Sequence, residues 1–368
     1  MSHRRPPGKL RRATEREEAV RPLGERGPRL RVRVGAVATV VAITISGAVA
    51  TASATVARPR ASSVSRDFPT PTKALCKKTS YKIGYDVFSG SQPFANLVTQ
   101  GLVNAAKAIG CATVVKTIDN LNGPVAVGNL KTLINEKIDG FVDFQVLAAY
   151  QPAIAKILKS AKIPGVAIVG ANLPGSPDVG ASNYAAAYRD GLYMAQQAKK
   201  RFPGQLPYVL GGAEPSAGAI IMERYYGAVN GEKKVFPNLP KSHIIEVQTD
   251  GTETTAYNNT LSALSAVPSG AVVLLTGVND EVTGGMAKAA LSRHVTNYLV
   301  NSFGGDPYGL SQVCSNSHYV GAWYLEPEVW GQDALTAIMM QINGQKVQKL
   351  IGVIGEEVTH STPWLHCK

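Results

Sequence analysis

From residue 80 to the end of the chain, short apolar runs alternate with longer segments whose apolar residues recur every three or four positions. The short runs are typical of buried strands, and the longer segments are typical of amphipathic helices. The first half of this region predicts helices between strands at residues 81–87, 113–118, 140–144 and 166–169. This β-α-β order indicates a parallel sheet with helices on both faces.

The same alternation begins again after a long helix that is expected at residues 185–201. Further strands are expected at residues 208–210, 243–247, 271–275, 298–302 and 319–323, with a closing strand at 350–358. The run at 271–275 is apolar throughout, as a strand buried on both faces requires. The chain therefore predicts an α/β fold of two Rossmann-like lobes, each with its own parallel sheet.

The N-terminal 54 residues are predicted to be a basic leader followed by an apolar export signal. Residues 1–33 hold eleven Lys/Arg against four Asp/Glu, which is most of the net charge of +12, and residues 34–57 carry no charge. A basic flank, an apolar run and the sequence Ala52-Ser53-Ala54 are typical of a secretory signal, cleaved here after Ala54. An uncleaved anchor at residues 34–57 remains the alternative, because about 20 apolar residues suffice to cross a bilayer. Both interpretations place the lobes outside the cytoplasm, in the cell envelope or periplasm.

Residues 55–79 are rich in Pro, Ser, Thr and basic side chains, and we expect a disordered linker there. The remaining positive charge is thinly spread over the lobes and does not indicate a nucleic-acid partner. Since 45% of the residues are hydrophobic and 17% charged, the lobes can bury substantial cores.

Four cysteines are present, and an exported chain can join them in disulfides. Of the three possible pairings, the order of the predicted elements favours Cys76–Cys111 and Cys314–Cys367. The alternative is that at least one pair stays free as small buried side chains. No CxxC spacing occurs and the histidines are scattered, so we expect no zinc site and no cofactor.

Small, polar and acidic residues follow many of the predicted strands. In open α/β sheets the ligand binds beyond the carboxyl ends of the strands, and two such sheets predict a site in the cleft between them. The candidate ligand-binding residues from these turns are Gln92, Phe94, Asn172, Glu214, Asp250, Asn279 and Asp306. They suit a neutral polyhydroxyl ligand better than a phosphate.

Four segments carry a resemblance to a known family: KIGYDVFSGSQPFANLVTQGLVNAAKAIG, IDGFVDF with IPGVAIVG, VLLTGVNDEVTGGMAKAAL, and GAWYLEPEVWGQDALTAIMMQINGQKV. Because of the order and spacing of these segments over residues 80–360, the chain resembles type I periplasmic (solute-binding) proteins of sugar ABC transporters, of the ribose-binding-protein class. The resemblance implies a three-crossing hinge near Asn183, Tyr324 and Lys349 and closure of the lobes on ligand. It assigns residues 80–183 with 325–348 to the N-terminal lobe and 184–324 with 349–368 to the C-terminal lobe.

The resemblance also implies roles for single residues. Gln92, Phe94, Asn279 and Tyr324 match ligand contacts of the family. Other positions depart from it: Gly170-Ala171-Asn172 replace an Asp-Arg pair, Met222 stands where an Arg is expected, and Gly304 stands where an Asp is expected. These departures predict a pocket with less charge than that of the pentose binders.

We therefore expect an exported substrate-binding component of an ABC importer that binds a sugar or similar small polar solute and catalyses no reaction. Its expected partners are the solute and a membrane permease, and a monomer is expected. The alternatives are a membrane-anchored sensor feeding a receptor kinase and an extracellular carbohydrate-active enzyme. Against an enzyme, the sequence has no GxSxG elbow, no phosphate-binding GxxxxGK[ST] loop and no HExxH motif.

Overall fold

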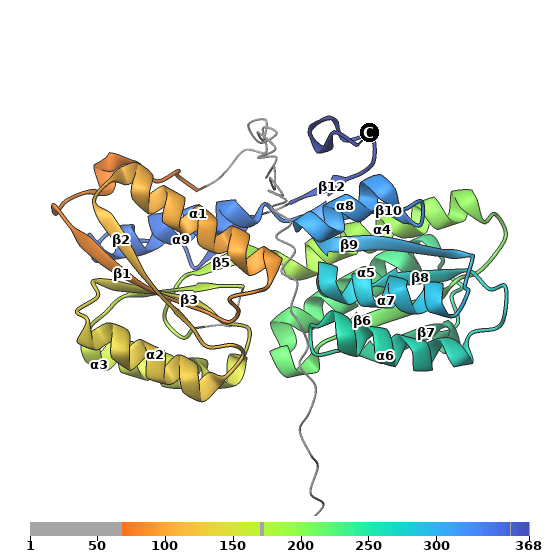
Figure 1. The fold of residues 1–368 in the computed structure, drawn as a ribbon, viewed down its shortest axis with the longest axis horizontal. Coiled ribbons are helices and arrows are strands. Elements are labelled where there is room, and N and C mark those ends of the chain that lie inside the picture. The colour runs from red at the N-terminus through yellow and green to blue at the C-terminus, as the bar shows by residue number, and fades with distance from the viewer. Residues whose placement is uncertain (1–67, 170–172, 354, 368) are drawn as a thin grey trace, which may run out of the picture. The chain divides into compact units, whose positions relative to one another are not determined.

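The computed structural model describes residues 68–169, 173–353 and 355–367. Within these residues the strands form two separate six-stranded sheets, each covered by its own helices (Figure 1). We call the sheet that contains β1, with its helices, the first lobe, and the other sheet with its helices the second lobe. The fold is the predicted α/β arrangement of two Rossmann-like lobes.

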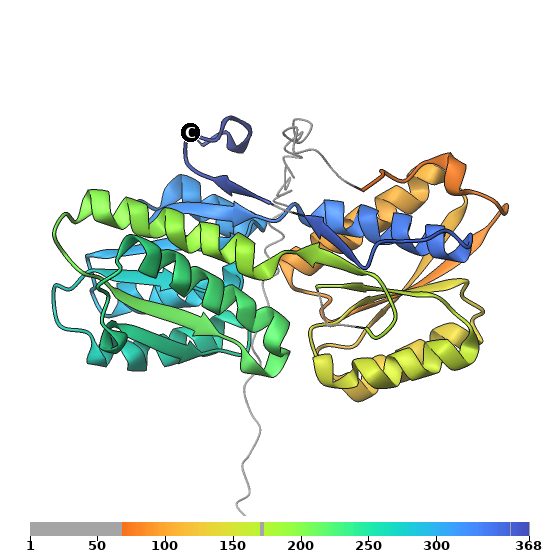
Figure 2. The same cartoon turned by 180° about the vertical axis from the view of Figure 1, so that it is seen from behind.

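In the first lobe the strand order is β11-β5-β4-β3-β1-β2, and all pairs are parallel. Helices α1 and α9 cover one face of this sheet, and α2 and α3 cover the other (Figures 1 and 2). The elements are β1 (Tyr81–Val87), α1 (Pro93–Ile109), β2 (Ala112–Ile118), α2 (Gly123–Asn135), β3 (Gly140–Phe144), α3 (Gln151–Ala161), β4 (Gly165–Ile168), β5 (Asp178–Ala181), α9 (Pro327–Ile342) and β11 (Leu350–Val353).

In the second lobe the order is β12-β10-β9-β8-β6-β7, and only β12 runs antiparallel to its neighbour among the described strands. Helices α4 and α5 pack on one face, and α6, α7 and α8 pack on the other. The elements are α4 (Asn183–Arg201), β6 (Tyr208–Ala213), α5 (Ala219–Val235), β7 (Ile244–Gln248), α6 (Glu253–Ala263), β8 (Val273–Thr276), α7 (Asp280–Ser292), β9 (Tyr298–Gly304), α8 (Pro307–Ser315), β10 (Tyr319–Tyr324) and β12 (Glu356–Val358).

The described chain passes between the sheets after β5, after β10 and after β11. The assignment of residues 349–353 to the second lobe is wrong, because β11 pairs in parallel with β5 from Leu350 to Val353. The single closing strand expected at 350–358 is in fact two strands in two sheets. The change of partner within residues 350–358 depends on the neighbouring strand that each half pairs with, β5 for β11 and β10 for β12.

The expectation of a disordered linker up to residue 79 is wrong for its described part, residues 68–79. Phe68 is buried, and Lys73–Leu75 forms a short 3-10 helix. Asn343 Nδ2 at the end of α9 donates to the carbonyl oxygen of Leu75 at 2.8 Å. Residues 55–67 and the apolar stretch at 34–57 lie outside the described residues. Among the helices of the described chain, none is long and apolar enough to cross a membrane.

All four cysteines of the chain are paired, and the favoured pairing is confirmed. Cys76–Cys111 fixes the segment before β1 to the start of β2, and Cys314–Cys367 fixes the C-terminal segment to α8. The ring of Trp364 in that segment also packs against Tyr324 at a tilt, with ring centroids 5.1 Å apart. Each disulfide therefore holds a terminal segment against one lobe.

The first lobe has its closest helix contact where α1 crosses α9. A Cβ atom on Gly101 would lie 2.0 Å from the carbonyl oxygen of Glu328, and one on Gly331 would lie 2.1 Å from that of Val98. Only glycine allows the two backbones to approach so closely. The crossing buries Trp330 completely, so this residue is part of the core.

A group of polar side chains holds β12 in the second lobe. Asn301 Nδ2 donates to Asp190 at 2.7 Å and to both carboxylate oxygens of Glu357 at 3.1 Å. Burial raises the pKa of Glu357 to about 8, although the hydrogen bond from Asn301 opposes the shift. Burial and the neighbouring Glu357 also raise the pKa of Asp190. These acids therefore take up protons when the chain folds.

The variant Glu357→Gln tests this linkage. In the unfolded chain the carboxyl group ionises near pH 4.5. The stability that protonated Glu357 contributes is therefore full below this pH and is lost as the pH rises to about 8. We expect Glu357→Gln to be more stable than the natural protein at pH 8 by at least about 2 kcal/mol, with the difference shrinking towards pH 5. Urea unfolding at both pH values measures this, with the exposed Glu223→Gln as control. Parallel pH profiles for Glu357→Gln and the natural protein would contradict the assignment.

Removing Cys314 and Cys367 together, by the double change to Ser, should lower the free energy of unfolding by about 2–4 kcal/mol. The physical reason is that the bond closes a loop between residues 53 apart and so restricts the unfolded chain. Denaturant unfolding without reductant measures the loss. Equal stability of the variant and the natural protein would show that the bond does not constrain the chain.

Candidate functional site

The described residues enclose a cavity of about 360 Å³ lined from both lobes. Its lining residues follow the carboxyl ends of parallel strands in each sheet, as expected for open α/β sheets. In the first lobe they come from the segments after β1, β2, β3 and β4, and in the second from those after β6, β7, β8 and β9. Leu325, in the passage after β10, completes the lining.

Five of the candidate residues line this cavity: Gln92, Phe94, Glu214, Asp250 and Asn279. Asn172 lies outside the described residues. The structure does not bring Asp306 or Tyr324 into the lining.

Asp306 and Tyr324 have other surroundings. Asp306 is fully buried, and its carboxylate accepts a hydrogen bond from the Gly309 amide at 2.8 Å at the start of α8. Tyr324 packs against Trp364, and the backbone of Gly305 lies against its ring. Both residues lie behind the lining of the cavity.

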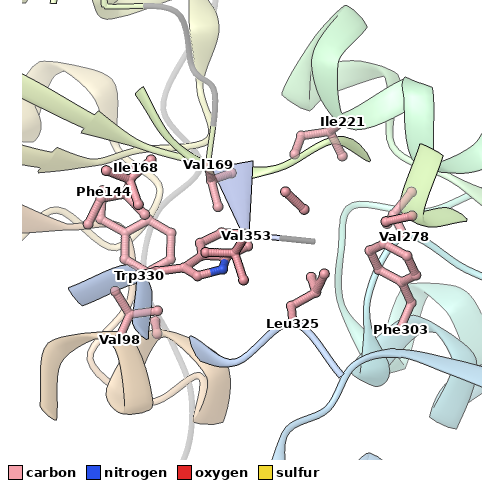
Figure 3. Close-up of a cluster of buried hydrophobic side chains, with 14 of the residues drawn as sticks. Val98, Phe144, Ile168, Val169, Ile221, Val278, Phe303, Leu325, Trp330 and Val353 are labelled. Carbon is pink, nitrogen blue, oxygen red and sulfur yellow. The ribbon is translucent and has the colours of Figure 1, made fainter. Parts of the chain in front are cut away.

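The first-lobe wall of the cavity is largely apolar, with Phe88, Phe94, Leu121, Phe144, Val146 and Val169. Phe94 meets Trp330 edge to face at 5.1 Å, and Phe88 meets Phe144 in the same way at 4.9 Å. Phe94 is thus both a packing residue and a lining residue. Figure 3 shows apolar side chains of the two lobes around the site, with Phe144 and Val169 from the first lobe and Ile221, Val278 and Phe303 from the second.

Three buried carboxyl groups lie at the ends of the strands that carry this wall. Asp86 accepts hydrogen bonds from Thr117 and Asn129, Asp119 accepts one from Gln145, and Asp143 accepts one from Gln151. Burial raises the pKa of Asp119 and of Asp143 to about 7.

Gln145 also accepts hydrogen bonds from the backbone amides of Val146 and Leu147, both at 2.9 Å. These bonds fix the loop after β3 and thereby position Val146 in the wall.

Arg224 in α5 is the one basic side chain among the described lining residues, and it is not among the residues predicted from the sequence. The resemblance implies an Arg at the position of Met222, but the basic side chain that lines the cavity lies two positions later. Its Nε donates to Asn183 Oδ1 and an Nη donates to the carbonyl oxygen of Val278, both at 2.8 Å. The guanidinium also lies 5.2 Å from the centre of the Phe303 ring. Arg224 thus supplies a positive charge that the position of Met222 lacks, and the comparison of the pocket's charge with that of the pentose binders stays a prediction.

Glu214 and Glu281 add acidic groups to the second-lobe wall. Burial raises the pKa of Glu214 to about 7, with Arg224 opposing the shift and Asp250 adding to it. Burial, reinforced by the charge of Asp306, also raises the pKa of Glu281 to about 7, and the Gln92 side-chain amide lowers it in part.

Two oxygens at this point of the cavity have no hydrogen-bond donor among the described residues. Both Glu281 Oε1 and Gln92 Oε1 are buried and unpartnered. A buried acceptor without a donor costs free energy, so these oxygens favour a ligand that brings donors.

Asn279 shapes the second-lobe wall through both atoms of its amide. Its Oδ1 caps α7 by accepting from the Val282 amide at 2.8 Å, and its Nδ2 donates to the Gly251 carbonyl at 2.9 Å. Asn279 thus ties the loop after β7 to the start of α7, beside Asp250, which is itself bound to Thr252 and Thr255.

The arrangement is suited to binding a small solute. It offers apolar side chains from both lobes, hydrogen-bond acceptors, and one guanidinium that is partly used by the protein. Among the described residues, no group of three or more His, Cys, Asp or Glu is placed to hold a metal ion.

Solved structures with a similar fold are solute-binding proteins. An ABC transporter periplasmic solute-binding protein from Actinobacillus succinogenes, with bound D-allose, is 18% identical; the match covers 76% of this chain and 98% of that one, with a TM-score of 0.65. One from Mycobacterium smegmatis with bound glycerol is 17% identical over 77% and 95%, with a TM-score of 0.66. One from Bacillus halodurans with bound myo-inositol is 13% identical over 77% and 96%, with a TM-score of 0.63.

No curated protein sequence matches the chain. A family profile, however, matches residues 83–346, which include all or part of β1 to β10 and every segment that lines the cavity. The two parallel sheets, the passages between them and the cavity at their strand ends agree with that match. The chain belongs to the periplasmic binding protein domain family.

Proposed function

We propose that this protein is the exported substrate-binding component of an ABC importer, and that it takes a sugar or similar small polar solute into the cavity. The observation that carries the proposal is one cavity lined from the strand ends of both sheets, with unpartnered acceptors from each. Family membership and the solute-binding proteins of similar fold support it. No catalytic step is part of the proposed function.

The proposed mechanism is closure of the lobes on the solute by rotation about the three passages between the sheets. Closure encloses the solute between Gln92 of the first lobe and Glu214 and Glu281 of the second. Each solute donor that is buried without an acceptor costs about 1–3 kcal/mol, so a solute is selected by how completely its polar groups find partners. The faces of Phe94 and Phe303 cover its C–H surface.

The ligand contacts we propose among the original candidates are Gln92, Phe94, Glu214 and Asp250, with Asn279 as a positioning residue. Asn172 stays a prediction. The closed form is proposed to deliver its solute to a membrane permease. Export with cleavage after Ala54 also stays a proposal, and the two disulfides support an oxidising location outside the cytoplasm.

A thermal-shift screen against sugars and polyols, including D-allose, myo-inositol and glycerol, tests the proposed function. A ligand at 100 times its Kd should stabilise the folded protein by about 2.7 kcal/mol and raise its melting temperature by several degrees. No shift with any sugar, polyol or amino sugar would contradict the proposal.

The variant Asn279→Ala tests the position of the site with the same ligand. Loss of the amide frees the loop at Gly251 from α7, so we expect the ligand-induced shift to fall by more than half. Asn122→Ala is the matched control, because Asn122 caps α2 by accepting from the Val125 amide and lies outside the lining. Both variants lose about 1 kcal/mol from the cap, but only Asn279→Ala should lose binding. Equal ligand shifts in the two variants would remove Asn279 from the site.

A further inference from the structure

The two walls of the cavity differ in their polar groups. Among the described lining residues, the first lobe contributes only Ser89, Ser91 and Gln92 as polar side chains. The second lobe contributes several carboxyl groups and Arg224. A neutral sugar with hydroxyl groups on every side would find fewer side-chain partners on the described first-lobe wall than on the second-lobe wall.

The free polar atoms where the two walls meet are acceptors. Gln92 Oε1 comes from the first lobe and Glu281 Oε1 from the second, and both are buried without a donor. The carboxyl group of Glu214 lines the same cavity from the second lobe. A hydroxyl group brings one donor, whereas an ammonium group brings three donors and no acceptor.

Arg224 is the one basic side chain among the described lining residues, and it balances the acidic groups of this wall only in part. Arg224 is committed to Asn183 and Val278 and lies within the field of Glu214. Lys288 is engaged with Glu253 at 2.7 Å and does not line the cavity. Asp306 is fully buried with its Oδ2 unpartnered, and it lies close enough to Glu281 to raise the pKa of that carboxyl group. A buried charge is tolerated when an opposite charge with good hydrogen bonds lies next to it.

We infer that the natural solute is cationic: an amino sugar or a similar polyol amine whose protonated amino group lies between Gln92 and Glu281. Its C–H face packs on Phe94 and Phe303. The inference rests on the proposed solute-binding function and specifies the class of solute. A carboxylate between Gln92 and Glu281 would bring no donor to these two acceptors and would be repelled by ionised Glu281.

Isothermal titration of the purified protein at pH 7 with matched pairs of amine and alcohol tests the inference. The pairs are D-glucosamine with D-glucose, D-galactosamine with D-galactose, and D-glucamine with D-sorbitol; N-acetyl-D-glucosamine serves as an uncharged amide. We expect at least one amine to bind at least tenfold more tightly than its alcohol, and the amide to lose this gain.

The outcomes separate the inference from the proposed function. If a neutral member binds as tightly as its amine or more tightly, the inference fails while the solute-binding function stands. If no compound of either class binds, both fail.

The variant Glu281→Gln tests the place of the amino group, because it keeps the shape and one acceptor but removes the charge. We expect at least a tenfold loss of affinity for the amine and little change for its alcohol. Glu223→Gln is the matched control, since Glu223 lies exposed on α5 outside the lining. Melting curves without ligand establish that both variants fold. An amine preference that survives in Glu281→Gln would overturn the placement.

Discussion

Parallel strands that are buried on both faces bring their carboxyl ends, and the loops that follow them, to one edge of a sheet. This constraint acts in both lobes. Strands such as β3 and β8 have no exposed residue. The polar groups that can reach a solute are therefore those of the loops that follow the strands. The cavity is lined from these loops in both sheets. The position of the site is therefore a consequence of strand direction, and its chemistry is a consequence of the loop residues.

Buried acids are a recurring feature of these loops and of the layer below them. Asp86, Asp119 and Asp143 support the first-lobe wall, and Asp190 and Glu357 hold the last strand of the second lobe. Burial raises the pKa of each, to about 7 for Asp119 and Asp143 and to about 8 for Glu357. A protonated acid can be buried at lower cost than a carboxylate and still donates a hydrogen bond. Glu281 differs from them because it lies at the cavity, where an arriving cation can stabilise its ionised form.

The sequence is sufficient to predict the two sheets, the disulfides and five of the lining residues, because these depend on local periodicity and on strand ends. It is not sufficient where a residue's partner is distant. The split of residues 350–358 between two sheets depends on β5 and β10, to which β11 and β12 respectively pair. Arg224 lies inside a helix, on a face that becomes a cavity wall only when α5 packs beside Asn183 and Val278. Asp306 follows a strand like the true lining residues, yet its cap on α8 turns it away.

Under the proposed function the two walls have different roles. The apolar first-lobe wall contributes affinity, and the acceptors of the second-lobe wall contribute selectivity. Contact with Phe88, Phe94 and Phe144 removes apolar surface from water, which favours closure for any solute of suitable shape. The acceptors of the second-lobe wall lose their hydrogen bonds to water on closure. They regain hydrogen bonds only from solute donors that are correctly placed. Selection among solutes of one shape therefore falls to Glu214 and Glu281. Because Asn279 and Arg224 fix the loops around these acids through bonds to backbone carbonyls, the acceptors are held in place before a solute arrives.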